Sequence, residues 1–157
     1  MKQYIFLTLT IIALVSPTYA ADIAVKGKAC WTGSRDMMTV SKTNWGMSVD
    51  IQGTFMDQKS PDESSYFECS GHFQMLDGAM APQTYNCMHY FSDGSQVLER
   101  GEVTEDGGTK HVFLEGTGRH KGVSGSFVGG KRIAIGKAPD NKFAACRDIE
   151  GIKKLAN

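Results

Sequence analysis

An alternation of apolar and polar side chains constrains the fold of this chain more than any other feature. In residues 45–55 the odd positions carry apolar or small side chains: Trp45, Met47, Val49, Ile51, Gly53 and Phe55. Residues 67–75 repeat the pattern: Phe67, Cys69, Gly71, Phe73 and Met75. A period of two puts successive side chains on opposite faces of a β-strand. Both segments are therefore predicted to be strands of an antiparallel sheet with one covered and one wetted face.

Weaker alternation predicts further strands along the rest of the chain. They span residues 23–31, 85–91, 96–104, 110–115, 123–128, 132–135 and 142–146. Glycine turn signals separate several of them: Asp77-Gly78, Asp93-Gly94, Asp106-Gly107-Gly108 and Gly129-Gly130. About eight or nine short strands at regular spacing predict an all-β fold, either an antiparallel β-barrel of about eight strands or a β-sandwich. Residues 148–155 are ambiguous, because their apolar spacing fits a helical turn that Gly151 weakens.

The first twenty residues have the layout of a secretory signal peptide. Lys2 supplies the positive charge, residues 4–15 are almost entirely apolar, and Thr18 and Ala20 precede the predicted cleavage point. The apolar run is shorter than the roughly 20 residues that a spanning helix needs. We therefore expect cleavage after Ala20 and a periplasmic or secreted mature chain, residues 21–157, that forms one barrel domain without a membrane anchor.

The four cysteines all lie in the expected mature chain, and an even number behind an export signal predicts two disulfides. Cys69 and Cys87 share the apolar parity of their strands, so an odd-length loop between the strands would bring them opposite each other. A two-residue Asp77-Gly78 turn would not. Cys30 and Cys146 are out of phase with their apolar neighbours and lie in the first and last strands, which a barrel brings together. Of the three possible pairings we therefore favour Cys69–Cys87 with Cys30–Cys146.

The charge balance argues against a nucleic-acid partner. Lys and Arg total 17, Asp and Glu total 17, and only Lys2 lies in the predicted leader. Binding to a polyanion depends on a basic excess, which this chain lacks.

One glycine-rich segment resembles a known family. Residues 116–125 read Gly-Thr-Gly-Arg-His-Lys-Gly-Val-Ser-Gly. This stretch resembles the G-T-G-[KR]-[FYH]-x-G-x-x-G segment of allene oxide cyclase and dirigent-like proteins. The resemblance implies an eight-stranded, calycin-like antiparallel barrel with a central cavity. None of the functional positions of those families can be matched here, and the cysteines and leader suggest a secreted bacterial branch of the group.

Four histidines are the main candidates for polar chemistry. His72 and His111 fall on predicted wetted faces, and His120 lies in a basic turn expected to be a solvated loop tip. His89 shares the parity of Cys87 and Phe91, so it is predicted to point inward.

The turn after His89 decides what surrounds it. A two-residue Asp93-Gly94 hairpin would place Arg100 opposite Cys87 and beside His89. The register of Glu99 and Glu102 is left open.

No catalytic, metal-binding or cofactor-binding motif stands out, so the sequence predicts a binding function. The partner would be a small apolar ligand in the barrel, or a macromolecule held by the loops. The predicted ligand site contains Trp45, Met47, Phe73, His89 and Arg100. The alternatives are an enzyme with a cyclase-like active site using His89, Arg100 or Glu99, and a structural envelope protein with a filled core. The oligomeric state is left open.

Overall fold

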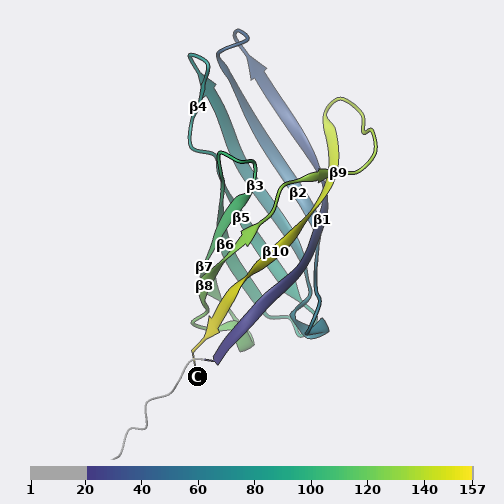
Figure 1. Ribbon diagram of the computed structural model, residues 1–157, viewed down its shortest axis with the longest axis vertical. Helices are drawn as coiled ribbons and strands as arrows, with labels where there is room; N and C mark the ends of the chain where they lie inside the picture. Colours follow the sequence, from purple (N-terminus) through teal and green to yellow (C-terminus); the bar gives the residue numbers. More distant parts are fainter. Residues whose placement is uncertain (1–20, 157) are drawn as a thin grey trace, which may run out of the picture.

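The computed structural model describes residues 21–156, and the predicted signal peptide lies outside these residues. The described chain is all-β, with ten strands and two short 3₁₀ helices (Figure 1). Eight strands form the barrel: β1 (Ala21–Thr39), β2 (Trp45–Asp57), β3 (Ser65–Leu76), β5 (Thr84–Phe91), β6 (Gln96–Val103), β7 (Thr109–Gly116), β8 (Ser124–Gly129) and β10 (Lys142–Leu155). The remaining elements are short: η1 (Pro61–Glu63), β4 (Ala79–Met80), η2 (Gly118–His120) and β9 (Ile133–Ala134).

The strands follow one another around the barrel and every neighbouring pair is antiparallel. The order is β1-β2-β3-β5-β6-β7-β8-β10, with β4 and β9 as additional strands on β3 and β10. The ring closes because β1 also pairs with β10, from Ala21 opposite Leu155 to Ser34 opposite Lys142. The predicted barrel is therefore confirmed and the alternative sandwich is not observed, because the strands of a sandwich form two open sheets and do not close a ring. The ambiguous residues 148–155 continue strand β10.

The alternation in β2 and β3 has the predicted effect. Val49, Phe55 and Phe67 are buried in the interior, whereas the intervening Asp50 and Glu68 are exposed. The interior cluster also includes Val25, Phe127 and Ile149 from β1, β8 and β10. A single ring of strands thus encloses one apolar interior.

The two disulfides occupy different faces of the barrel, and they are the pairs favoured from strand parity. Cys69 and Cys87 pair across β3 and β5 with both residues buried in the interior. Cys30 and Cys146 pair across β1 and β10, at the contact that closes the ring. Their neighbours Ala29 and Trp31 line the interior, so the sulfurs of this second bridge lie on the outer side.

The route to the Cys69–Cys87 register differs from the expected odd-length loop. Asp77 and Gly78 form a two-residue turn with positive φ angles of 52° and 81°, and Leu76 pairs with Ala79 across it. That register alone would put the cysteines on opposite faces. Residues 81–83 then contain one residue more than the β3 segment opposite, and the pairing resumes with His72 opposite Thr84. This irregularity restores the parity that the disulfide needs.

The two ends of the barrel differ. At the end drawn lowest in Figure 1 lie η1, η2 and the turn after β5. This is the closed end of the barrel, because His120 and Lys153 are buried there. At the opposite end the β1–β2 and β3–β4 hairpins extend beyond the other strands, beside the loop formed by residues 130–141.

Candidate functional site

The interior contains a cavity of about 570 Å³. Its wall is mostly apolar and rich in aromatic side chains: Trp31, Phe55, Phe67, Phe73, Tyr85, Phe91, Phe113, Phe127 and Phe143. A cavity of this size falls within the range of small-molecule sites, which combine apolar walls with a few placed polar groups.

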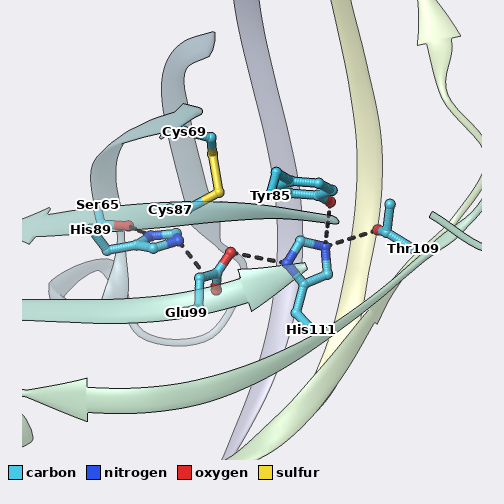
Figure 2. Close-up of a disulfide and its surroundings, with 8 residues drawn as sticks. All are labelled: Ser65, Cys69, Tyr85, Cys87, His89, Glu99, Thr109 and His111. Carbon is cyan, nitrogen blue, oxygen red and sulfur yellow. Dashed lines mark hydrogen bonds and ion pairs between the residues drawn. A yellow bond between two sulfur atoms is a disulfide. The ribbon is translucent and has the colours of Figure 1, made fainter. Parts of the chain in front are cut away.

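Glu99 is the most deeply buried charged residue of this wall, with only 2% of its surface exposed. It lies on β6 opposite Cys87 of β5 and Phe113 of β7. Two imidazoles flank its carboxylate, one from each neighbouring strand: Oε1 is 2.9 Å from His111 Nδ1, and Oε2 is 3.3 Å from His89 Nε2 (Figure 2). The second contact is close enough for an ion pair, although it lacks hydrogen-bond geometry.

A β-bulge between β6 and β7 puts His111 in the interior. Val97 pairs with Gly116 and Leu98 with Glu115, but Glu99 pairs with Phe113, so Leu114 is left over. The extra residue reverses the parity of the rest of β7, because a shift of one position exchanges the two faces of a strand. His111 is therefore 6% exposed, and the prediction that it lies on a wetted face is wrong.

His111 is held on both ring nitrogens. Its Nδ1 faces Glu99, while Nε2 lies 2.8 Å from Thr109 Oγ1 and 3.1 Å from the Tyr85 hydroxyl. The ring stacks on Phe127 with centroids 4.2 Å apart. A proton on Nδ1 lets this imidazole donate to Glu99 Oε1, so both of its ring nitrogens have hydrogen-bond partners.

His89 lies on the other side of the carboxylate and is hydrogen-bonded through one ring nitrogen. Its Nδ1 lies 2.8 Å from Ser65 Oγ, and its ring packs beside Phe67 and Phe91. The polar string thus crosses four adjacent strands, from Ser65 on β3 to His111 on β7.

The environment keeps Glu99 ionised. Burial raises the pKa of Glu99, but the two imidazoles, His89 foremost, outweigh burial and lower the pKa to about 2. Burial also raises the pKa of Tyr85 to about 12, so its hydroxyl keeps its proton at neutral pH. The site therefore offers a fixed carboxylate, two imidazoles and a phenol beside an aromatic cavity.

Close packing around Tyr85 requires glycine at position 101. A side-chain carbon at Gly101 would come within 2.4 Å of the Tyr85 ring. Absence of that carbon lets the phenol lie across β6 and reach His111.

The residues predicted for ligand binding divide into two groups. Met47, Phe73 and His89 line the cavity, whereas Trp45 and Arg100 do not. Trp45 lies at the far end of β2, opposite Thr39 and Met75. Arg100 pairs with Asn86 and is exposed on the outer face, so its predicted position opposite Cys87 is wrong.

The length of one turn explains the Arg100 error. Phe91 N–H donates to Ser95 O, so the loop between β5 and β6 has three residues, 92–94, rather than two. The third residue, Gly94, has a φ of 81°, as three-residue hairpin loops require. The change in loop length turns Glu99 inward and Arg100 outward.

His120 is also placed differently from the prediction. It is completely buried at the closed end and packs on Phe91, with ring centroids 4.1 Å apart. Burial, together with the nearby charge of Lys153, lowers the pKa of His120 to about 4. Its neighbour Arg119 pairs with Glu63 and Asp93, and Lys153 pairs with Glu63 as well. The prediction of a solvated turn is therefore wrong for His120, whereas Arg119 and Lys121 are exposed and Arg119 forms ion pairs.

Two comparisons of the sequence found nothing: no protein-family model matches it, and no curated protein matches it significantly. The structure, however, is similar to solved dirigent proteins. The pterocarpan synthase dirigent protein GePTS1 has a TM-score of 0.55 and 11% identity, covering 97% of this chain and 99% of that one. The pterocarpan synthase dirigent protein PsPTS1 has a TM-score of 0.52 and 12% identity, covering 88% and 98%. At this identity the similarity concerns the fold: the chain has a closed eight-stranded barrel of the dirigent type.

Proposed function

We propose that the protein binds a small, mainly apolar molecule in the interior of its barrel and orients it against the Glu99 cluster, formed by Ser65, His89, Glu99, His111 and Thr109. The observation that carries this proposal is the aromatic-walled cavity of about 570 Å³ with a buried string of hydrogen-bonded and ion-paired polar groups on one side. Apolar walls supply affinity, and a few fixed polar groups supply orientation.

The ordered polar string favours binding over a purely structural role. A barrel that serves only as a structural element gains more stability from apolar filling, because a buried carboxylate carries a large desolvation cost. Glu99, His89 and His111 instead line an open space.

Catalysis is a second candidate, and the arrangement of His89, Glu99 and His111 favours it. A carboxylate between two imidazoles can hold or pass a proton at a bound substrate. Two dirigent proteins of similar fold are named pterocarpan synthases, and this supports testing the present barrel for catalysis.

We further propose that the protein is exported after cleavage behind Ala20, as a member of a secreted bacterial branch of the allene oxide cyclase and dirigent-like group, and that its mature chain is one domain. Two disulfides support this proposal, since such bonds persist in oxidising compartments. Among the described residues, no helix is long and apolar enough to cross a membrane.

Native mass spectrometry of protein purified from its own host tests the binding proposal. We expect a bound compound that is released on denaturation. The two tryptophans supply a matched test, because Trp31 lines the cavity and Trp45 does not. Titration with the neutral probe N-phenyl-1-naphthylamine should quench Trp31 in W45F more strongly than Trp45 in W31F. No co-purified compound, together with no saturable quenching, would contradict the proposal.

If a compound co-purifies, the E99Q variant separates binding from catalysis. If the wild type converts the compound and E99Q binds it without converting it, the catalytic candidate is supported. Binding without conversion in both wild type and E99Q would leave binding as the function.

A further inference from the structure

We infer that the molecule held in the barrel is an organic anion, and that its acidic group pairs with Arg147 while its apolar body lies against the aromatic wall. This inference rests on the proposed binding function and adds the chemical class of the ligand. It starts from a guanidinium that projects into the cavity without an acidic partner.

Arg147 lies on β10 with its side chain lining the cavity. Its Nη1 donates to Thr109 Oγ1, and its guanidinium carbon lies 5.1 Å from the centre of the Trp31 ring. Its Nε is buried and has no hydrogen-bond partner among residues 21–156. Because Nε is covered by protein atoms, a ligand would have to pair with the rest of the guanidinium, which lines the cavity without an acidic partner.

Room for Arg147 is provided by the neighbouring strand. A side-chain carbon at Gly129 would come within 2.6 Å of Arg147 Cδ and 2.4 Å of Thr109 Oγ1. The glycine therefore lets the arginine cross β8 and reach Thr109.

Besides Lys153, which pairs with Glu63, three further cations line the same cavity: Arg35, Lys131 and Arg132. Within the described part of the chain, neither they nor Arg147 lie within 4.0 Å of a carboxylate. Arg35 donates to the main-chain oxygen of Asp140. These cations come from β1, β10 and the loop after β8, so several elements contribute the positive charge.

The acidic residues that line the cavity are already engaged. Glu99 faces two imidazoles, and Glu63 pairs with Lys153 and Arg119 at the closed end. Asp106 accepts hydrogen bonds from Thr104 Oγ1 and Gly108 N–H in its own turn. Asp57 accepts from main-chain N–H groups of residues 59 and 60. Each of these carboxylates therefore has partners of its own and none lies within 4.0 Å of Arg147, while the charge of Lys131 contributes, after Thr104, to the lowered pKa of Asp106.

The surroundings of Arg147 agree with this picture. Burial lowers the pKa of Arg147, Tyr85 partly offsets that effect, and the neighbouring Arg132 lowers the pKa further. A guanidinium stays protonated even so. Placed next to a mainly apolar wall, it selects an amphipathic anion over both a neutral hydrocarbon and a bare inorganic anion.

A matched pair of fluorescent probes tests the inference. N-phenyl-1-naphthylamine is neutral, and 8-anilinonaphthalene-1-sulfonate has the same ring system with a sulfonate. Both are titrated into W45F, in which quenching of Trp31 reports binding in the cavity, and into W45F carrying R147M or R147K. The control is W45F carrying R100M, because Arg100 is exposed on the outer face of the same barrel.

We expect R147M to weaken sulfonate binding by about tenfold and to change neutral-probe binding by less than about twofold. R147K should recover part of the loss, and R100M should behave as the parent. Equal sulfonate binding in R147M and the parent, with the neutral probe still bound, overturns the inference and leaves the binding function standing. Failure of both probes to quench Trp31 in the parent overturns both.

If R147M no longer binds even the neutral probe, the salt dependence of the parent decides. Sulfonate affinity that falls with added NaCl while neutral-probe affinity holds supports the ion pair, because salt screens charges. Sulfonate affinity that does not change with salt overturns it.

Discussion

Glu99 on β6 lies opposite Phe113 on β7, although Val97, two residues earlier on β6, lies opposite Gly116. The residue left unpaired between these pairs is Leu114, which is 47% exposed. This single bulge decides which half of β7 faces the cavity, and with it the surroundings of Glu99.

The bulge predicts an unusual pattern of tolerance along β7. We expect V112D and L114D each to lower the free energy of unfolding by less than about 1 kcal/mol, because both side chains point outward. F113D should lower it by about 3 kcal/mol or more, because it puts a charge among the aromatic residues of the wall. Urea denaturation followed by circular dichroism measures all three variants. Equal losses in all three would contradict the bulge.

The Cys30–Cys146 disulfide, which links the two strands that close the ring, makes a prediction about stability. Cys30 and Cys146 are 116 residues apart, so the double variant C30A/C146A releases a long loop in the unfolded chain. The loop-entropy model gives a loss of about 5 kcal/mol, against about 3 kcal/mol for the 18-residue separation of Cys69 and Cys87. Guanidinium denaturation of the two double variants under identical conditions compares them.

The inner bridge contributes packing as well as a crosslink, because Cys69 and Cys87 are buried in the interior. A variant C69A/C87V restores part of that volume. If the C30A/C146A barrel is as stable as wild type, the crosslink at the closing strands contributes nothing.

The errors of the sequence analysis have a common physical origin. The number and spacing of strands predicted the barrel, and strand parity together with the meeting of the first and last strands predicted the two disulfide pairs, because these signals extend over many residues and average over local irregularities. The inward side of β6 and β7 depended on one residue each: the third loop residue before Ser95 and the bulge at Leu114. Apolar character pointed the wrong way there, since Val112 and Leu114 are exposed while His111 is buried.

The same reasoning explains which parts of the site were found. His89 was predicted to point inward because its parity follows Cys87 directly on one strand. Glu99 could not be placed, since its direction depends on the length of the loop before it. Nothing in the local sequence around Arg147 predicts that its side chain points into the cavity.

The ionised state of Glu99 predicts a dependence of stability on pH. Its folded pKa of about 2 lies below the ordinary value of 4.5. A lowered carboxyl pKa stabilises the fold fully above the unfolded value, and this contribution is lost as the pH falls from about 4.5 through about 2. The loss for this group is about 3 kcal/mol, because each pKa unit corresponds to about 1.4 kcal/mol.

E99Q is the variant that isolates this contribution. It removes the titration but keeps the shape of the side chain. Urea denaturation at pH 7, 4.5, 3 and 2 should show the wild type losing about 3 kcal/mol more than E99Q over the acid range. Parallel pH profiles would show that Glu99 is not held ionised by His89 and His111.

The contact between Tyr85 and Gly101 predicts the last result. Burial raises the pKa of Tyr85 to about 12, and the ring keeps its place only while position 101 lacks a side chain. In G101A the new methyl group must displace the phenol, so we expect the pKa of Tyr85 to fall toward its ordinary value of 10 and the Tyr85–His111 contact to be lost. Ultraviolet titration of tyrosine absorbance in G101A, with Y85F identifying the high-pH step, measures the change.

The raised pKa of Tyr85 also predicts how stability depends on pH. A raised tyrosine pKa stabilises the fold below about pH 10, and this contribution is lost as the pH rises toward 12. Wild type should therefore lose stability more steeply than Y85F in that alkaline range, and G101A should fall between them. An unchanged high-pH step in G101A would mean that the phenol is held in place by contacts other than those across β6.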